Sequence, residues 1–222
     1  MSVELVELER VVLDIVEDYL SKNRQFDIDD IVPYISYYLR RTQNHLNYEG
    51  IKSVLKSLVK KNVLIEGSKL THDDVLNNDK RKKIYNHILK NPGIYFTKIV
   101  NDLGFSNHVV VWHQNILIKF NFIKKRIFEK HEIFFGSNVD VQKAKFGFYT
   151  SLNKSQKIIH FLQENNTGIT KTRLSKALNI HLNTISKYLL ILEGLKIILK
   201  EKIDNKNLFF LNEELLPKIN LF

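Results

Sequence analysis

Polar side chains gather at the start of one predicted helix near the C-terminal end of the chain. That helix covers residues 183–195, and Ile185, Leu189 and Leu192 recur in it at the spacing of a core-facing stripe. The side chains left pointing outward near its start are Asn183, Thr184, Ser186 and Lys187. All four can hydrogen-bond to base edges or to phosphates, so this helix start has the chemistry of a nucleic-acid contact.

Basic side chains lie on both sides of this helix in the sequence. The preceding predicted helix carries Lys171, Arg173 and Lys176, and the predicted hairpin that follows carries Lys200, Lys202 and Lys206. Such residues fix a protein on a duplex by contacting the phosphate backbone. The six side chains are therefore predicted to form a phosphate clamp around the helix at 183–195.

A second, less charged set lies in the middle of the chain. A predicted helix at 107–120 leaves Asn107, His108 and Trp112 exposed, together with two valines. The basic residues of the following hairpin are Lys124, Lys125, Arg126 and Lys130. Trp112 is expected to pack on a sugar–phosphate backbone or on a protein surface, or to lie partly in the core. The C-terminal set is thus the stronger candidate for reading bases.

The elements that position both sets form an internal repeat. Residues 93–124 match residues 168–199 at an offset of 75, with Gly93-Ile94 opposite Gly168-Ile169 and Phe122-Ile123 opposite Ile197-Ile198. Upstream the offset is 74, with Ile84 opposite Ile158. Each copy is predicted as helix, helix, tight turn, helix and two strands. The predicted helices are 79–91, 97–103 and 107–120 in one copy and 153–165, 170–178 and 183–195 in the other; the hairpin tips are 130–132 and 204–207.

The first 78 residues follow the same plan more loosely. Helices are predicted at 4–22, 28–39 and 48–61, with Pro33 starting or bending the second. The apolar stripe predicted for the first helix is Leu5, Leu8, Val12, Ile15 and Tyr19. Residues 63–65 and 69–70 are predicted to pair as a short hairpin around the turn at 66–68. We therefore expect the same fold here.

These segments resemble tandem winged-helix transcription regulators of the broad ArsR/MarR-like kind found in archaea and bacteria. The resemblance covers 79–212 well and 1–78 weakly, and rests on segments such as 91–94, 110–113, 168–175 and 184–189. It implies a mainly helical α+β fold with small hairpin wings, divided into domains at 1–78, 79–150 and 151–222. The family usually has an apolar residue at Gln114 and a helix-ending Gly at Asn121 and Lys196; Asn121 can adopt the left-handed conformation that such an end needs.

Charge is distributed unevenly along the chain, whose formal net charge is +10. Residues 1–78 hold 10 basic and 13 acidic residues, residues 79–150 hold 13 and 5, and residues 151–222 hold 11 and 6. The whole basic excess therefore lies on the two clear copies, where a polyanion-binding surface is expected. The blander interpretation is that lysine serves only as a solubilising residue. Together with the resemblance, the charge predicts a sequence-specific, double-stranded-DNA-binding transcriptional regulator.

Other chemistries find little support in the sequence. The chain has no cysteine, which excludes disulfides and thiolate ligands. His108 and His113 are five residues apart and do not share a helix face, so no metal site is predicted. No catalytic motif appears, and we expect neither an enzyme nor a cofactor. Without a signal sequence or a long apolar stretch, the protein is expected in the cytoplasm and not in a membrane.

Protein contacts form the alternative. Winged-helix arrays also build the ESCRT membrane-remodelling complexes and RNA polymerase subunits similar to the three-winged-helix subunit of polymerase III, where they act as scaffolds. Tyr34, Tyr37, Tyr38 and Tyr48 could line a ligand or partner surface, although core and interface packing is the better-supported use. The acidic residues 1–78 are predicted to serve dimerisation or partner docking. A homodimer is expected through that region or through the apolar tail residues Leu215, Leu216, Ile219, Leu221 and Phe222.

Overall fold

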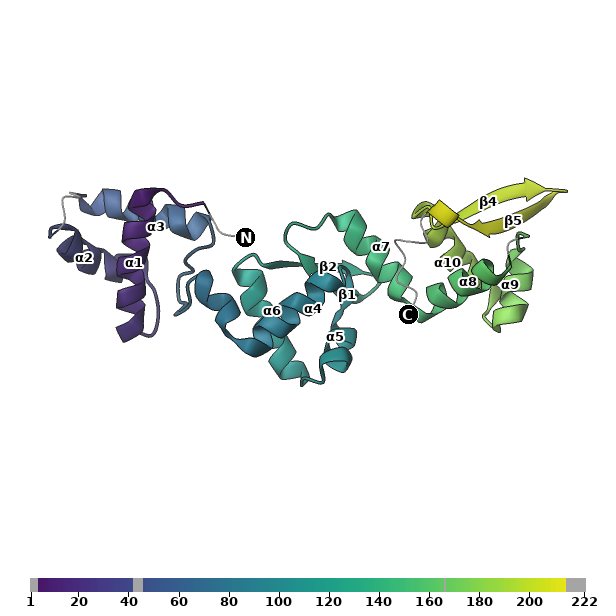
Figure 1. Cartoon of the computed structure of the whole chain (residues 1–222), viewed down its shortest axis with the longest axis horizontal. Helices are drawn as coiled ribbons and strands as arrows, with labels where there is room; N and C mark the ends of the chain where they lie inside the picture. Colours follow the sequence, from purple (N-terminus) through teal and green to yellow (C-terminus); the bar gives the residue numbers. More distant parts are fainter. Residues whose placement is uncertain (1–3, 42–45, 166, 215–222) are drawn as a thin grey trace. The chain divides into compact units, whose positions relative to one another are not determined.

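A computed structural model describes residues 4–41, 46–165 and 167–214 (Figure 1). The first helices are α1 (Glu7–Lys22), α2 (Ile28–Leu39) and α3 (Tyr48–Lys60), followed by the short 3₁₀ helix η1 (Asp73–Asn77). Next come α4 (Asp79–Lys90), β1 (Ile94–Tyr95), α5 (Phe96–Leu103), α6 (Asn107–Lys119), β2 (Ile123–Phe128), β3 (His131–Gly136) and α7 (Val141–Ser151). The last are α8 (Asn153–Glu164), α9 (Lys171–Leu178), α10 (Leu182–Gly194), β4 (Ile198–Ile203) and β5 (Lys206–Leu211). The described chain is mainly helical with small antiparallel sheets, which confirms the α+β class.

Backbone contacts divide the chain into two compact units. The first consists of the described residues up to His87 together with Val100–Lys124, and the second of Ile88–Ile99 together with the described residues from Lys125 onward. The three domains expected at 1–78, 79–150 and 151–222 remain a prediction. The apolar tail proposed for dimerisation lies outside the described residues.

In the first unit, α1, α2 and α3 enclose an apolar core. The buried face of α1 consists of Val12, Val16 and Leu20, four residues apart, with Leu13 beside them. Of the predicted stripe of Leu5, Leu8, Val12, Ile15 and Tyr19, Val12 is buried and Leu5, Ile15 and Tyr19 are partly buried against this core, so the prediction is confirmed in part. Apolar residues lie on several faces of α1, so the sequence period alone could not select the face that meets α2 and α3.

A buried carboxylate joins α1 to α3. Glu9, which is 4% exposed, accepts hydrogen bonds from the Val6 backbone N–H (3.0 Å), the Ser57 hydroxyl (2.7 Å) and the Lys61 ammonium (2.6 Å). The hydrogen bond from Lys61 is the largest reason why the pKa of Glu9 is lowered, and it outweighs the desolvation that would raise it. The buried charge is thus fully partnered.

The hairpin predicted at 63–70 was wrong, since those residues form no strand in the structure. Gly67 turns with φ +73°, and the backbone around it bonds to the loop before α2: Gly67 N–H donates to Phe26 C=O and Phe26 N–H donates to Ser68 C=O. The backbone groups of this segment are therefore bonded to that loop and do not pair with each other as a hairpin. Pro33 lies inside α2, which begins earlier, at Ile28, where Asp27 caps it.

The two repeat copies have matching element boundaries. Helices α4 and α8 are offset by 74, whereas α5 and α9, α6 and α10, β2 and β4, and β3 and β5 are each offset by 75. Left-handed residues follow the same register: Gly93 and Gly168 precede α5 and α9, and Asn121 (φ 56°) and Lys196 (φ 59°) end α6 and α10. The left-handed conformation expected for Asn121 is confirmed.

Both hairpins turn through two residues rather than the longer tips predicted. Glu129 and Lys130 have positive φ, as do Asp204 and Asn205, which is the backbone of a two-residue turn. His131 and Glu132 therefore belong to β3, and Lys206 and Asn207 to β5. Strand β3 lies between β1 and β2, while β4 pairs with β5 and Ile169 forms a bridge to Phe209.

Helix α7 was not predicted, and it is held close to the segment before β1. A Cβ on Gly93 would lie 1.9 Å from the Ala144 carbonyl oxygen, and one on Gly147 would lie 2.0 Å from the Pro92 carbonyl oxygen. Only glycine fits at such distances. Phe148 of α7 packs in a cluster with Ile133 and Phe135 of β3, and Phe146 packs against the core of α8–α10. None of the helices in the described part of the chain is long and apolar enough to cross a membrane.

Candidate nucleic-acid interface

Helices α9 and α10 form the tight pair that presents the C-terminal set of polar residues. The Thr170 hydroxyl caps α9, Asn179 turns the chain in the left-handed conformation, and His181 Nδ1 accepts from the Asn183 N–H at 3.2 Å at the start of α10. Ile185, Leu189 and Leu192 are buried, which confirms the predicted core face of this helix. The caps and the core together fix which side of α10 is exposed.

A groove of about 350 Å³ lies where α9, α10 and the β4–β5 hairpin meet. The side chains that line it include Lys171 from the start of α9, Ser186 from α10, and Lys200 and Lys206 from the two strands. The structure thus brings together predicted residues from all three elements. Glu193 is the one carboxylate in the lining, against three lysines, so the groove carries a net positive charge.

The remaining basic residues extend this surface. Arg173 and Lys176 line a second hollow along α9, which adjoins the groove because Thr170 and Thr172 line both. Lys202 is exposed on β4 opposite Asn207, two residues beyond Lys200 and so on the same face of the hairpin. Since Asn207 also lines the groove, Lys202 continues it along the hairpin.

Lys187 has an internal partner. Its ammonium lies 2.7 Å from Glu129 Oε2, at the turn between β2 and β3, and the Tyr149 hydroxyl of α7 donates to Glu129 Oε1 at 3.3 Å. The hydrogen bond to Glu129 raises the pKa of Lys187. Ile191, one turn further along α10, packs with Leu195 against the cluster of Phe135 and Phe148. Lys187 therefore lies on the side of α10 that faces the neighbouring hairpin, whereas Ser186 faces the groove.

The other predicted readers differ in exposure. Asn183 is exposed near the start of α10, and Thr184 is half-buried. The sequence reasoning missed Thr170, Thr172, Asn207 and Leu190, all of which line the groove. Leu190 is 72% exposed and lies four residues after Ser186, so continuing the spacing of the exposed face would have found it.

The matching set in the first copy is less concentrated. Ser106 caps α6, and Asn107 and His108 are exposed at its start. Trp112 is 52% exposed, and with His108 it lines a hollow near the start of α4. In the first unit Lys124 is exposed at the start of β2.

The other basic residues predicted for this copy lie in the second unit. Lys125 forms an ion pair of 2.7 Å with Glu132 across the β2–β3 hairpin, and Arg126 and Lys130 are exposed. Because Lys125 is already paired, part of the charge predicted to clamp phosphates is neutralised within the hairpin.

His113 and Gln114 are both buried in α6. His113 is 3% exposed and Gln114 is 2% exposed, and neither His113 Nδ1 nor Gln114 Nε2 has a hydrogen-bond partner in the described chain. Burial lowers the pKa of His113, and the charges of Arg81 and Lys80 lower it further. Among the residues described, no three His, Asp or Glu side chains are grouped so that they could hold a metal ion.

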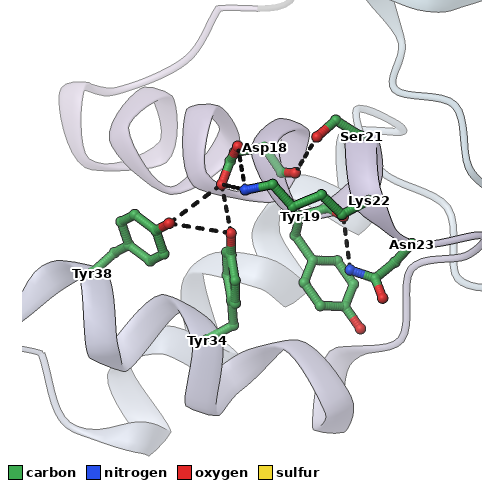
Figure 2. Close-up of polar contacts among 7 residues, drawn as sticks. All are labelled: Asp18, Tyr19, Ser21, Lys22, Asn23, Tyr34 and Tyr38. Atoms are coloured by element: carbon green, nitrogen blue, oxygen red, sulfur yellow. Dashed lines mark hydrogen bonds and ion pairs between the residues drawn. The ribbon is translucent and has the colours of Figure 1, made fainter.

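Two tyrosines of α2, Tyr34 and Tyr38, join α2 to α1 (Figure 2). The Tyr34 hydroxyl donates to Asp18 Oδ2 at 2.5 Å, and the Lys22 ammonium lies 3.0 Å from the same carboxylate. The hydrogen bond from Tyr34 is the main reason why the pKa of Asp18 is lowered. Tyr34 and Tyr38 pack with ring centroids 4.9 Å apart, whereas Tyr37 and Tyr48 are exposed. The expectation that these tyrosines pack within the fold is confirmed for Tyr34 and Tyr38.

Comparison with known proteins finds a relative but no matching family model. Over 147 residues, 66% of this chain, the sequence is 29% identical to a protein of Methanocaldococcus jannaschii named as an uncharacterized HTH-type transcriptional regulator. The match covers 37% of that relative's length, so this chain corresponds to only part of it. The similarity supports a transcription-regulator family for the aligned part.

Proposed function

We propose that the protein is a transcriptional regulator that binds double-stranded DNA in a sequence-specific manner through tandem winged helix-turn-helix domains. The proposal rests on the groove in which Lys171, Ser186, Lys200 and Lys206 come together from a helix pair and a hairpin. In winged-helix proteins the corresponding third helix enters the major groove while the hairpin follows the backbone. The name of the archaeal relative, an HTH-type transcriptional regulator, supports the same class.

The repeat register supports the tandem arrangement. Each copy orders its elements as three helices followed by a hairpin, with a left-handed residue ending the third helix at Asn121 or Lys196. In this proposal α10 reads bases through Asn183, Thr184 and Ser186, with Lys187 joining once it leaves Glu129. The lysines of α9 and of the β4–β5 hairpin hold phosphates. Asn107, His108 and Trp112 of α6, with Lys124, Lys125, Arg126 and Lys130, form the weaker contact.

A salt titration of binding to random duplex DNA tests the electrostatic part of this proposal. About six phosphate contacts give a slope of log K against log salt near −5. A slope near zero would contradict DNA binding. Sequence specificity is then tested by selecting preferred sites from a random duplex library, in which the absence of enrichment would leave only non-specific binding.

The homodimer is a separate proposal that follows from the acidic residues 1–78 and the apolar tail. Sedimentation at tens of micromolar protein tests it directly. A monomer under those conditions would remove the dimer and leave the DNA-binding proposal in place.

A further inference from the structure

The first unit has a hollow of about 700 Å³ that shares no lining residue with the groove of α9, α10 and the β4–β5 hairpin. One side is formed by the end of η1 and the start of α4, and the other by α6. The residues that line it are Asn77, Asn78, Asp79, Lys80, His108, Val109, Trp112 and His113. This set is rich in hydrogen-bond donors and includes the only tryptophan of the chain.

A buried cation lies beside this hollow. Arg81 is 3% exposed, its Nη1 donates to the Val75 carbonyl oxygen at 2.7 Å, and its Nε has no hydrogen-bond partner. Its guanidinium carbon lies 5.6 Å from the centre of the Trp112 ring. Within the described chain no carboxylate forms an ion pair with Arg81. A buried charge without a counter-ion is costly, and Arg81, which is not itself part of the lining, adds positive charge beside the hollow.

His113 gives a second, independent indication. It lines the hollow, is 3% exposed, and leaves Nδ1 without a partner in the described residues. Burial lowers the pKa of His113, and the nearby charges of Arg81 and Lys80 lower it further. An anion in the hollow would offset the positive charge of Lys80 and Arg81.

The start of α4 adds to the positive electrostatic potential in the hollow. Asn78 caps this twelve-residue helix by accepting from the Arg81 N–H at 3.1 Å, and a helix N-terminus carries a partial positive charge. Asp79 is the one carboxylate in the lining. Lys80 in the lining and Arg81 beside it outnumber this carboxylate, and Asn77, Asn78 and His108 add polar side chains. Trp112 offers a flat apolar face to whatever carries the anion.

We propose that this hollow binds a phosphate-type anion, held by Lys80 and the α4 N-terminus, beside Arg81 and Trp112. The anion could belong to a free small molecule or to the backbone of DNA. Both sources present a phosphate group, and they differ in whether duplex DNA binding depends on Lys80.

The fluorescence of Trp112 reports the site directly, because the chain has no other tryptophan. Inorganic phosphate is titrated into the full chain and compared with sodium chloride at equal ionic strength. We expect a saturable change with phosphate alone. Lys80→Ala should weaken phosphate binding about tenfold, as expected for the loss of one charged hydrogen bond. Lys83→Ala is the matched control, since Lys83 is exposed on the same helix and does not line the hollow.

An absent or non-saturable change would overturn the proposal, as would an equal effect of Lys80→Ala and Lys83→Ala. Lys80 is exposed, so its substitution tests binding without disturbing the core, and circular dichroism checks this.

Duplex DNA separates the two sources. If the natural ligand is a free small molecule, Lys80→Ala and Lys83→Ala should bind random duplex DNA equally, and phosphate should not compete beyond its ionic strength. If it is a backbone phosphate, Lys80→Ala should bind DNA more weakly than Lys83→Ala, and phosphate should compete. Since the fluorescence titration contains no DNA, its failure would leave the proposed regulator function standing.

Discussion

The two repeat copies share a backbone plan and differ in the surfaces of their third helices. Helix α6 buries His113 and Gln114 and exposes Val111 and Trp112, whereas the buried side chains of α10 are all apolar. The elements nevertheless begin and end in register. The copies share their left-handed residues and buried apolar positions, while their outer side chains differ. The comparison shows that the two copies keep the same element boundaries while their third helices present different side chains to the surface.

The glycines before α5 and α9 give the sharpest contrast between the copies. Gly93 and Gly168 both have positive φ, but a Cβ on Gly93 would meet the Ala144 backbone at 1.9 Å, whereas one on Gly168 would meet the Phe210 ring at 2.4 Å. A ring can rotate away and a helix backbone cannot. We expect Gly93→Ala to lower the free energy of unfolding by about 4 kcal/mol and Gly168→Ala by about 1–2 kcal/mol. Urea denaturation of the two variants measures this, and equal losses would contradict it.

The next largest effect concerns the groove. Removing Lys171, Lys200 and Lys206 together by alanine substitution should weaken binding to random duplex DNA about 100-fold near 0.15 M salt and reduce the salt slope by about three. The control removes Lys143, Lys154 and Lys157, three exposed lysines of α7 and α8 outside the groove. Similar losses in both variants would show that net charge, and not this groove, attracts DNA.

Base reading by α10 should produce a smaller and more selective effect. Asn183→Ala and Lys187→Ala should each cost about 1–3 kcal/mol on the preferred site and flatten the sequence preference. Lys202→Ala, on the hairpin, should weaken all sequences about equally and lower the salt slope by about one. A selected-site assay in which Asn183→Ala keeps the full preference would mean that α10 is not the reader.

The smallest expected effect comes from the contact between Glu129 and Lys187. Because this exposed pair must open before Lys187 can contact DNA, Glu129→Gln should raise DNA affinity about twofold to fivefold. Glu132→Gln is the matched control: it removes an equal charge from the same hairpin and breaks a pair of the same 2.7 Å length, with Lys125 instead of α10. An equal gain in the two variants would assign the effect to net charge alone.

The repeat made much of the architecture predictable. Its period located the helices and hairpins of both copies, because caps such as Ser106 and Thr170 and turns such as Asn179 act locally. The hairpin predicted at 63–70 does not form because Gly67 and Ser68 hydrogen-bond instead to the backbone of Phe26, some 40 residues away. A single sequence gives no signal for that contact. The missing α7 lay outside the repeat, and its glycine contacts with Pro92 and Gly93 have no signal in a single sequence.

The candidate interface likewise has residues that the sequence predicts and contacts that it does not. Lys171, Lys200 and Lys206 could be predicted because they are basic residues of the helix and the hairpin that flank α10 in the sequence, and all three line the groove. The ion pair of Lys187 with Glu129 could not be predicted, since Glu129 lies 58 residues earlier and meets α10 only through the packing of α7 and β3. The unpartnered state of Arg81 likewise depends on how η1 and α6 enclose α4. Local patterns predict which side chains are available, and tertiary packing decides which are already engaged.

The mutual fit of Gly93 and Gly147 also has a consequence for how the second unit opens. Each glycine admits a carbonyl from the other segment, so neither the Pro92–Ile94 turn nor α7 can move aside without losing both contacts at once. Amide protons of the α7 interior and the Gly93 N–H, which is bonded to the Phe134 carbonyl, should therefore exchange with solvent in a single cooperative event. Segments that are about fifty residues apart in the chain would then behave as one unit of local unfolding.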